Sequence, residues 1–349
     1  MDTSRLTAYS TVSTSLALRS DLEMGRLVAR AEPLGLGIGG RSALLEVDGT
    51  RVFVKRVPLS DRELLPENLR STANLFGLPA YFNYGIGSPG LGPWRELAAH
   101  VMTTNWVLAG QYPGFPLMYH WRVLPDTAPP MPELLSDVER TVAYWGGGQE
   151  VRDRLDGLQQ SSASLVLFLE HFPYNLHEWL DAQVRAGDDS ANLACELVAR
   201  ELEAGVSFMN AHDLLHFDAH ALNVLTDGRR LYFADFGLAL SSRFDLSPEE
   251  SDFFDRHRTY DRACTRTHLV HWLAAAFYDR GGDERDELVR SWAEGEPPTG
   301  VPEAAAAILA RHSPLASVMG DFYRVLQRES RQTPYPLEKI KPLVENLTS

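Results

Sequence analysis

The pattern of apolar residues predicts strands in the first half of the chain. Two short apolar runs, residues 42–47 and 51–55, flank an Asp48-Gly49 pair that favours a hairpin turn. Residues 164–169 form a longer uninterrupted apolar run, which predicts a buried strand that ends shortly before a proline. We therefore expect a β-sheet in this half of the chain.

Apolar residues at helical spacing predict a helix between Pro93 and Gly110, with Leu97, Val101 and Leu108 on its buried face. Proline is favoured at the first position of a helix and glycine just after its last position, so both ends of this segment carry the expected residues. We expect this helix to pack against the sheet.

The second half of the chain combines a long predicted helix with a hairpin. The apolar period that starts at Leu193 stops at Asn210, a residue type common at helix ends. Two short apolar strands then surround the Asp227-Gly228 turn, within residues 223–235. The last third is expected to be mostly helical, interrupted at four prolines: Pro297, Pro298, Pro302 and Pro314.

Prolines and glycines also mark a predicted insertion at residues 111–163. This segment contains six prolines and a run of three glycines, so we expect loops with one or two helices. We divide the chain into an N-terminal part, residues 1–170, which includes this insertion, and a helical C-terminal part, residues 171–349.

Residues 216–223 and 235–237 carry the candidate chemistry. They read His-Phe-Asp-Ala-His-Ala-Leu-Asn and Asp-Phe-Gly, so Asp218 precedes Asn223 by five residues and Asp235 follows the second strand of the predicted hairpin. Phosphoryl transfer needs positioned groups more than covalent chemistry: one aspartate that orients a hydroxyl, and an asparagine and an aspartate that hold Mg²⁺. We expect the hairpin to bring Asn223 and Asp235 together.

In these residues the chain resembles the protein-kinase-like superfamily, whose catalytic loop reads H-x-D-x-x-x-x-N and whose metal loop reads D-F-G. The resemblance covers about residues 30–275. It implies an α+β, two-lobed fold, with an antiparallel N-lobe sheet, a helix that carries a glutamate, and a mostly helical C-lobe. It also implies ATP and Mg²⁺ as cofactors, with Asp218 acting on the acceptor hydroxyl and with Asn223 and Asp235 as Mg²⁺ ligands.

Two differences from the eukaryotic-type protein kinases indicate which branch of the superfamily the chain resembles. Eukaryotic-type protein kinases carry Arg before the catalytic Asp and Lys two residues after it, whereas this chain has Phe217 and His220 there and lacks an A-P-E motif. His220, which we count among the catalytic residues, is similar to the second histidine in the H-G-D-x-H-x-x-N loop of the aminoglycoside phosphotransferase branch. That branch includes kinases of choline, homoserine and sugars. Phe217 replaces the glycine common there and leaves the subfamily open.

A glycine-rich stretch lies where the resemblance implies a loop that covers phosphates. Gly35, Gly37, Gly39 and Gly40 come before the strand that ends at Lys55. Glycines let the backbone approach phosphates closely, and a lysine at a strand end projects a cation toward them. A dinucleotide-binding unit would have a strand directly before such glycines and a helix directly after, but strand residues follow here.

The resemblance also implies a glutamate that pairs with Lys55. We favour Glu96, on the helix that Pro93 opens, with Glu63 and Glu67 as competitors nearer in sequence. Any of the three could instead belong to a solvated helix face.

The apolar strand at residues 164–169 is expected to lead into the hinge that binds adenine. By resemblance, Leu169 lies behind the base, and Glu170 and Phe172 offer backbone groups to it. A buried strand without a ligand fits the same residues.

Other interpretations of the candidate residues stay open. His212, His216 and His220 would line one face of a continuous helix and could then bind a catalytic metal, but the apolar period of that helix stops before them. A pseudokinase that only binds a partner would not need the complete set of lysine, aspartates and asparagine. A Ser/Thr kinase of a protein or maturing peptide would need an extended groove.

Composition and charge limit the partners. The 349 residues are 44% apolar, enough for a sizeable core. The 33 Lys and Arg against 47 Asp and Glu give a net charge of -14, which disfavours nucleic acid and anionic membranes as partners. Cys195 and Cys264 form no metal or disulfide pattern, and no signal peptide is recognisable, so we expect a cytoplasmic protein.

Together these features predict an ATP-dependent phosphotransferase that moves the γ-phosphate to a hydroxyl of a small molecule, with a cationic alcohol as the favoured class. We expect an acceptor pocket walled by C-lobe helices, with acidic residues near Asp218. Asp252, Asp255 and Asp261 are candidates for its lining, although each could lie on a solvated helix face, and Asp261 could instead support the catalytic loop.

Overall fold

The computed structural model describes residues 3–346, which divide into two compact units. The first unit comprises the chain up to His171 together with Asp235–Glu250, and the second comprises Phe172–Ala234 together with the chain from Ser251. The first unit is therefore discontinuous in sequence. The α+β class is confirmed at the level of an N-terminal antiparallel sheet followed by a largely helical C-terminal region.

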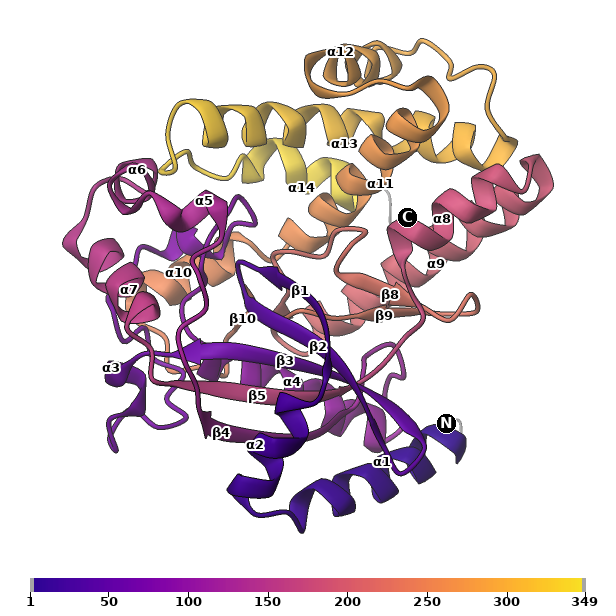
Figure 1. Cartoon of the computed structure of the whole chain (residues 1–349). Helices are drawn as coiled ribbons and strands as arrows, with labels where there is room; N and C mark the ends of the chain where they lie inside the picture. Colours follow the sequence, from indigo (N-terminus) through magenta and orange to yellow (C-terminus); the bar gives the residue numbers. More distant parts are fainter. Residues whose placement is uncertain (1–2, 347–349) are drawn as a thin grey trace. The chain divides into compact units, whose positions relative to one another are not determined.

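A five-stranded antiparallel sheet forms the centre of the first unit, in the order β1-β2-β3-β5-β4 (Figure 1). Its strands are β1 Glu32–Gly37, β2 Gly40–Val47, β3 Thr50–Leu59, β4 Met118–Pro125 and β5 Ala163–Glu170. The β2–β3 turn at Asp48 and Gly49 has positive φ at both residues, 49° and 78°, as a two-residue hairpin turn requires. The edge strand β4 lies inside the segment that was expected to contain only loops and helices.

Helix α4, Pro93–Leu108, packs on this sheet through Trp94 and Leu97, which belong to one apolar cluster with residues of β3, β4 and β5. Val101 was expected on the buried face but is 40% exposed. Polar residues of α4, including His100 and Thr103, are buried instead. The ring of His100 packs against Phe236.

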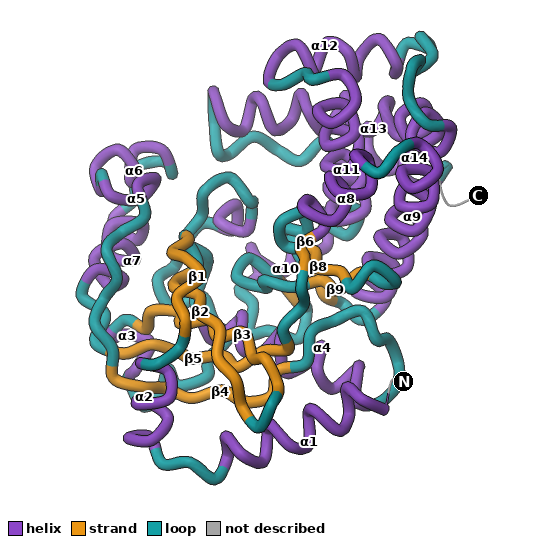
Figure 2. The backbone as a smooth tube through the Cα atoms, turned by 45° about the vertical axis from the view of Figure 1, so that its right-hand side comes forward, coloured by secondary structure: helices purple, strands orange, loops and turns teal. Residues whose placement is uncertain are grey.

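The remaining elements of the first unit are helices and one short strand (Figure 2). The N-terminal helices α1 and α2 lie beside β4 and were not predicted. The bounds of these elements are α1 Thr3–Ala17, α2 Asp21–Ala29, α3 Asp61–Leu64, η1 Ala80–Asn83, α5 Glu133–Ser136, α6 Val138–Tyr144, α7 Gln149–Gln159 and β10 Leu240–Ser241. Helix α10, Pro248–Arg256, starts in the first unit and ends in the second.

The second unit is mainly helical, with a small sheet in the order β6-β8-β9. Its helices are α8 Leu176–Arg185, α9 Asp188–Ala211, α11 Tyr260–Tyr278, α12 Gly282–Ala293, α13 Glu303–Arg328 and α14 Leu337–Glu345. Its strands are β6 Tyr174–Asn175, β7 Leu214–Leu215, β8 Val224–Thr226 and β9 Leu231–Phe233. The hairpin predicted around Asp227 and Gly228 is the β8–β9 pair.

Two details of the helical prediction are wrong. Leu193, taken as the start of the buried stripe of α9, is 69% exposed. Pro314 was expected to end a helix but lies inside α13. A proline can stay inside a helix when packing on neighbouring helices outweighs the lost hydrogen bond, and α13 packs on α11, α12 and α9.

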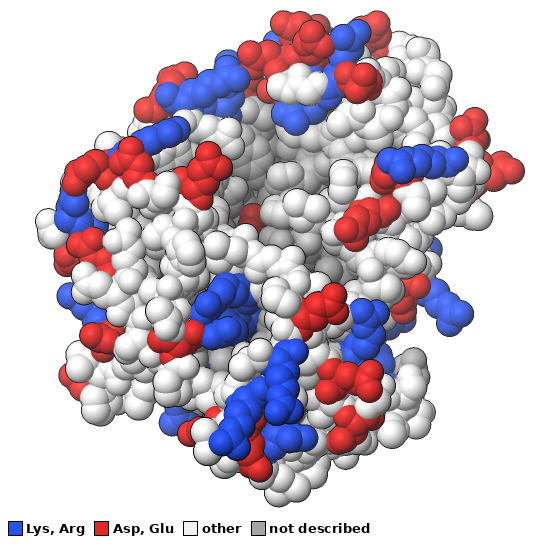
Figure 3. Space-filling view, in the orientation of Figure 1, with Lys and Arg blue, Asp and Glu red and all other residues white. Residues whose placement is uncertain are grey.

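Charged residues of both signs are mixed on the surface of α12, at the top of Figure 3. The excess of acidic residues therefore does not gather into a surface of one sign there. Within residues 3–346, no helix is long and apolar enough to cross a membrane. Cys195 and Cys264 are both buried free thiols.

Candidate functional site

Lys55 is held between two carboxylates in the first unit. Its Nζ atom lies 2.7 Å from Glu96 Oε1 and 2.8 Å from Asp235 Oδ1. Lys55 and Glu96 are almost fully buried, whereas the side chain of Asp235 is 44% exposed. Burial by itself would lower the pKa of Lys55, but the charges of Asp235 and Glu96 outweigh it and raise the pKa, so the ammonium stays protonated.

The elements that carry this cluster explain its geometry. Lys55 was expected at a strand end but lies in the middle of β3, opposite Ser42 of β2 and Leu167 of β5. Glu96 lies in the first turn of α4, where the helix dipole favours a negative charge. This is the pairing that the sequence analysis favoured. Of the two competitors, Glu63 pairs with Arg154 at 2.8 Å and Glu67 is exposed.

The glycine-rich turn between β1 and β2 lies against the Lys55 side chain. A Cβ atom on Gly39 would be 3.1 Å from Lys55 Nζ, so the backbone passes directly beside the ammonium group. Gly40 has φ of 122°, and a Cβ there would be 2.2 Å from the carbonyl oxygen of Arg56, so only glycine fits. The same argument does not apply to Gly35 and Gly37, whose surroundings would leave space for a side chain.

The Asp235-Phe236-Gly237 segment is anchored on α4. The ring of Phe236 is fully buried and meets His100 edge-on, with centroids 5.2 Å apart. His100 follows Glu96 by one helical turn, so neighbouring turns of α4 hold the Phe236 ring and the Lys55 ammonium. The backbone N–H of Gly237 lies 3.3 Å from Asp235 Oδ1 and fixes this carboxylate further.

A buried ion pair holds the end of the same segment. Arg95, adjacent to Glu96, donates to Glu250 Oε1 at 2.7 Å and to the carbonyl oxygen of Thr72, and both charged side chains are almost fully buried. Glu250 also accepts the backbone N–H of Ser247 at the start of α10. The segment that begins at Asp235 is therefore fixed to α4 at both of its ends. Arg95 was not among the predicted site residues, and its only signal in the sequence was its place beside Glu96.

Asp218, His220 and Asn223 form a second cluster, in the loop that follows α9 and β7. Asn223 Nδ2 donates to Asp218 Oδ2 at 3.0 Å, and His220 Nε2 lies 3.6 Å from Asp218 Oδ1. His220 Nδ1 accepts the backbone N–H of Leu222, which places the imidazole proton on Nε2, toward the carboxylate. Asn223 therefore holds one oxygen of the Asp218 carboxylate, and the His220 imidazole lies near the other.

The β8–β9 hairpin links this loop to Asp235 along the chain. The carbonyl oxygen of Asn223 accepts the backbone N–H of Ala234, the residue that directly precedes Asp235. His216 is fully buried, and its Nε2 lies 2.9 Å from the carbonyl oxygen of Ala234. These contacts fix the end of β9 to the loop that contains Asp218.

Asp261 of α11 stabilises the loop that carries Asp218. Its carboxylate is fully buried and accepts the backbone N–H groups of His216 at 2.6 Å and Phe217 at 2.9 Å. Burial raises the pKa of Asp261 to about 6, although the two N–H groups oppose this shift. Asp261 is therefore a structural support. Asp252 and Asp255 lie on an exposed face of α10, paired with arginines.

The metal-hydrolysis alternative loses its geometric basis. Helix α9 ends at Ala211, so His212, His216 and His220 do not share a helix face. His212 stacks on Phe208 instead. No group of three or more His, Cys, Asp or Glu in the described part of the chain could hold a metal ion.

The predicted adenine-binding residues have additional contacts. The backbone N–H of Glu170 donates to the carbonyl oxygen of Leu117, so this group is engaged within the first unit and is not available to a base. Its carboxylate accepts two hydrogen bonds from Arg5 of α1, at 2.8 and 2.6 Å. No sequence signal pointed to Arg5. Leu169 lies in the core of the sheet, and Phe172 stacks on Tyr232 with ring centroids 3.9 Å apart.

Phe217 combines a strained backbone with extensive packing. Its φ of 63° lies in the left-handed region, which costs a residue with a side chain about 1–2 kcal/mol. Its buried ring stacks on Tyr260 and Phe253. Removing a buried aromatic ring costs about 3–5 kcal/mol, so packing outweighs strain.

We therefore expect Phe217→Gly to lower the free energy of unfolding by roughly 2 kcal/mol, despite the relief of strain. Urea unfolding of the purified variant measures the change. Phe217→Leu, which keeps the strain and much of the apolar volume, serves as the control and should lose less. A Phe217→Gly protein more stable than the wild type would contradict the assignment of Phe217 as an anchor of the loop.

No protein-family model matches this sequence, and no curated protein shows significant similarity to it. The functional interpretation therefore rests on the residues and contacts described above.

Proposed function

We propose that this protein is an ATP-dependent phosphotransferase with a two-lobed, kinase-like fold, which moves the γ-phosphate to a hydroxyl group of a small molecule. The observation that carries the proposal is the Lys55 ammonium, paired with Glu96 and Asp235 beside the Gly39 backbone. A buried cation beside a glycine turn and an exposed carboxylate suits the phosphates of a nucleotide and its metal ion.

The chemistry of Asp235 and of Asn223, each taken by itself, suits a magnesium ion. Mg²⁺ prefers oxygen ligands and keeps several waters, so it needs only one or two protein groups. Asp235 offers a half-exposed carboxylate. The Nδ2 atom of Asn223 donates to Asp218, so Asn223 Oδ1 is the atom suited to bind a cation. The bound ion would neutralise charge on the phosphate oxygens during transfer.

The chain's own residues then have distinct roles. Lys55 binds phosphate oxygens, and Glu96 keeps the lysine side chain extended. The turn at Gly39 and Gly40 covers the phosphates with backbone N–H groups. Asp218 orients the acceptor hydroxyl and accepts its proton, and the hydrogen bond from Asn223 Nδ2 fixes its carboxylate.

An assay of ADP release tests the proposal. ATP and Mg²⁺ are supplied with a panel of small alcohols, neutral and cationic, and with serine peptides. We expect Asp218→Asn to lower turnover by about 10²- to 10⁴-fold, the usual contribution of a positioned general base. Asp252→Asn, an exposed aspartate of α10, is the matched control and should keep full activity. Unchanged turnover in Asp218→Asn would contradict the proposal. If only the serine peptides were phosphorylated, the acceptor would be a peptide and not a small alcohol.

The Lys55–Glu96 pair gives a second test. If both residues act through one contact to the phosphates, Lys55→Ala and Glu96→Ala should each lower kcat/KM for ATP by about 10²- to 10³-fold, and the double variant should lose no more than the larger single loss. Steady-state kinetics on the three variants measures this.

Glu63→Gln is the matched control for the glutamate, because Glu63 is equally buried but pairs with Arg154. It should destabilise the fold by about 3 kcal/mol and leave kcat/KM of the folded protein nearly unchanged. Losses that multiply in the Lys55→Ala, Glu96→Ala double variant would show that the two residues act independently.

A further inference from the structure

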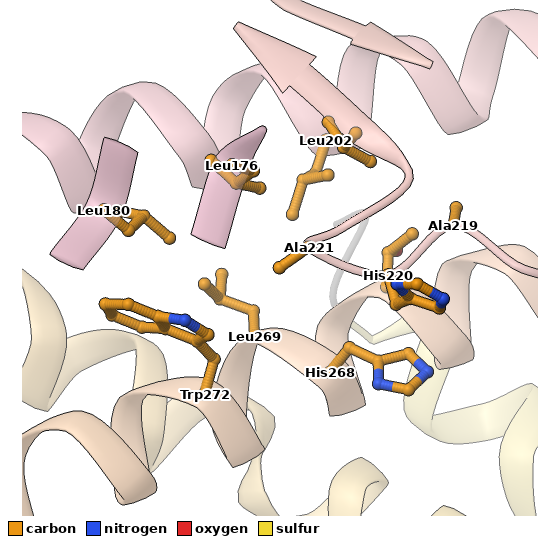
Figure 4. A pocket seen from close by; sticks show the side chains of 11 residues that line it. Leu176, Leu180, Leu202, Ala219, His220, Ala221, His268, Leu269 and Trp272 are labelled. Carbon is orange, nitrogen blue, oxygen red and sulfur yellow. The ribbon is translucent and has the colours of Figure 1, made fainter. Parts of the chain in front are cut away.

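The pocket beside His220 in the second unit is too small to bind the acceptor. Leucines of α8, α9 and α11 line it together with Trp272 (Figure 4). Its cavity volume is about 10 Å³, which is room for about one water molecule. None of the described residues that line it is acidic, so the acidic lining expected near Asp218 is absent from this pocket.

A second glycine-rich stretch, residues 85–92, lies directly before α4 in the first unit. It reads Gly-Ile-Gly-Ser-Pro-Gly-Leu-Gly. Gly90 has φ of 72°, in the left-handed region that favours glycine. Ser88 and Leu91 are buried, and Ser88 Oγ accepts the backbone N–H of Gly90 at 3.1 Å. The 85–92 loop is therefore a fixed turn.

Gly90 lies against the backbone of the segment that begins at Asp235. A Cβ atom on Gly90 would be 2.7 Å from the carbonyl oxygen of Gly237, closer than real Cβ atoms approach other atoms. A Cβ atom on Gly237 would in turn be 3.3 Å from Asp235 Oδ1 and 3.6 Å from Glu96 Oε2. Gly237 therefore contacts the 85–92 loop and lies close to both carboxylates of the Lys55 cluster.

Other contacts hold the 85–92 loop in place. The hydroxyl of Tyr144 in α6 donates to the carbonyl oxygen of Ile86 at 3.1 Å. A Cβ atom on Gly92 would be 3.0 Å from Oε1 of the buried Glu63. These contacts hinder the loop from moving away, so a side chain at position 90 would displace the Gly237 carbonyl.

We propose that Gly90 is a positioning residue for Asp235. The space beside Gly90 admits the Gly237 carbonyl, and the Gly237 N–H, 3.3 Å from Asp235 Oδ1, transmits this position to the carboxylate. The inference rests on the proposed function for the role of Asp235 as a Mg²⁺ ligand. It gives a role to the long connection between β3, which ends at Leu59, and α4, which begins at Pro93.

The affinity for ADP with and without Mg²⁺ tests the proposal. Calorimetry on the full chain gives both affinities without turnover, and their ratio isolates the contribution of the metal. Gly90→Ala should lower this ratio by about 10- to 100-fold, as substitutions behind a metal ligand commonly do. In the Asp235→Asn background, Gly90→Ala should cause little further loss, because the carboxylate through which Gly90 acts has been replaced.

Gly110→Ala is the matched control. Gly110 follows α4 and has φ of 71°, almost equal to that of Gly90, but apart from its chain neighbours no described atom lies within 4 Å of its Cβ position. Alanine therefore imposes similar backbone strain at both positions and meets Gly237 only from position 90. Both variants should be less stable in urea. The Mg²⁺ ratio, and the rate of amide hydrogen exchange in residues 235–240, should change only in Gly90→Ala.

The outcomes separate the two claims. A wild-type Mg²⁺ ratio in Gly90→Ala, or an equal loss in Gly110→Ala, would overturn the role of Gly90 and leave the phosphotransferase proposal standing. A wild-type protein whose affinity for ADP does not depend on Mg²⁺ would overturn the metal role of Asp235, and the inference with it.

Ser88→Ala decides the matter if Gly90→Ala does not fold. This variant removes the hydrogen bond that holds the Gly90 backbone and leaves the glycine in place. It should lower the Mg²⁺ ratio by a smaller factor than Gly90→Ala. An unchanged ratio in Ser88→Ala would then overturn the inference.

Discussion

Asp235→Asn should lower turnover by about 10²- to 10³-fold, because the substitution removes the charge of a proposed Mg²⁺ ligand without changing side-chain volume. The fold should persist, since Lys55 keeps its contact with Glu96 and the Asp235 side chain is 44% exposed. Steady-state kinetics over a range of Mg²⁺ concentrations, together with circular dichroism of the variant, measures both effects.

Asp255→Asn is a suitable control for this variant, because Asp255 is an exposed aspartate that lies outside both clusters. Its turnover and its Mg²⁺ dependence should match the wild type. If Asp235→Asn were fully active, Asp235 would not be a Mg²⁺ ligand. The proposal that the Lys55 cluster binds the nucleotide phosphates would then lose its support.

The second unit should lose stability steeply as the pH falls from 6 toward 4. Burial lowers the pKa of His257 and His312 to about 4 and that of His268 and His271 to about 3. Below pH 6.5 the unfolded chain binds protons that these folded histidines do not bind, so their stabilising contribution, complete above pH 6.5, is lost as the pH falls.

Asp261 acts in the opposite direction. Its raised pKa of about 6 means that the folded state binds an extra proton between pH 6 and the unfolded value of 3.8, so its protonation stabilises the fold as the pH falls. On folding, the four histidines each give up one proton and Asp261 takes up one, so about three protons are released in total. The free energy of unfolding therefore changes by about 4 kcal/mol per pH unit. Three of the histidines are partly exposed, and solvent screening lowers the expected slope to roughly 2–4 kcal/mol per pH unit.

His257→Phe tests this account. His257 is buried and stacks on Phe253 and Tyr335, so a phenyl ring can take its place without a titrating group. Urea unfolding at several pH values should show a slope about 1.4 kcal/mol per pH unit smaller than in the wild type between pH 6 and 5. A slope that His257→Phe does not change would show that other groups cause the acid sensitivity.

Features that depend on neighbouring residues could be predicted from the sequence. The Asp48-Gly49 and Asp227-Gly228 turns follow from the backbone conformations that glycine and aspartate allow, and both hairpins are present. Pro93 marked the start of α4, and the resemblance implied a helical glutamate that pairs with Lys55; Glu96 in the first turn of α4 makes this pair.

Features that depend on distant partners could not be predicted. Arg5 and Glu170 are 165 positions apart, and no local pattern links them. Val101 was placed in the core because it is apolar, but α4 buries His100 instead, whose ring meets Phe236. The choice between two faces of a helix depended on a partner 136 positions away. The same limit applies to Asp261, whose role depends on the loop folded above it.

The predicted class of acceptor shows the same limit. The net charge of -14 suggested a cationic acceptor, but charge summed over a chain does not locate carboxylates. The pocket beside His220 is built from leucines of α8, α9 and α11, which come together only in the folded unit. The proposed catalytic residues Asp218, His220 and Asn223 could be predicted because local geometry fixes their spacing within one loop.

The most direct test of the central claim is to follow the γ-phosphate of ATP by phosphorus NMR, with Mg²⁺ and a mixture of small alcohols present. The account predicts that the wild type converts ATP to ADP with a new phosphoester signal, that chelation of Mg²⁺ stops the conversion, and that Asp218→Asn forms the ester at least about 10²-fold more slowly. An ATP spectrum that stays unchanged with the wild-type protein, or an ester formed equally fast by Asp218→Asn, would contradict it.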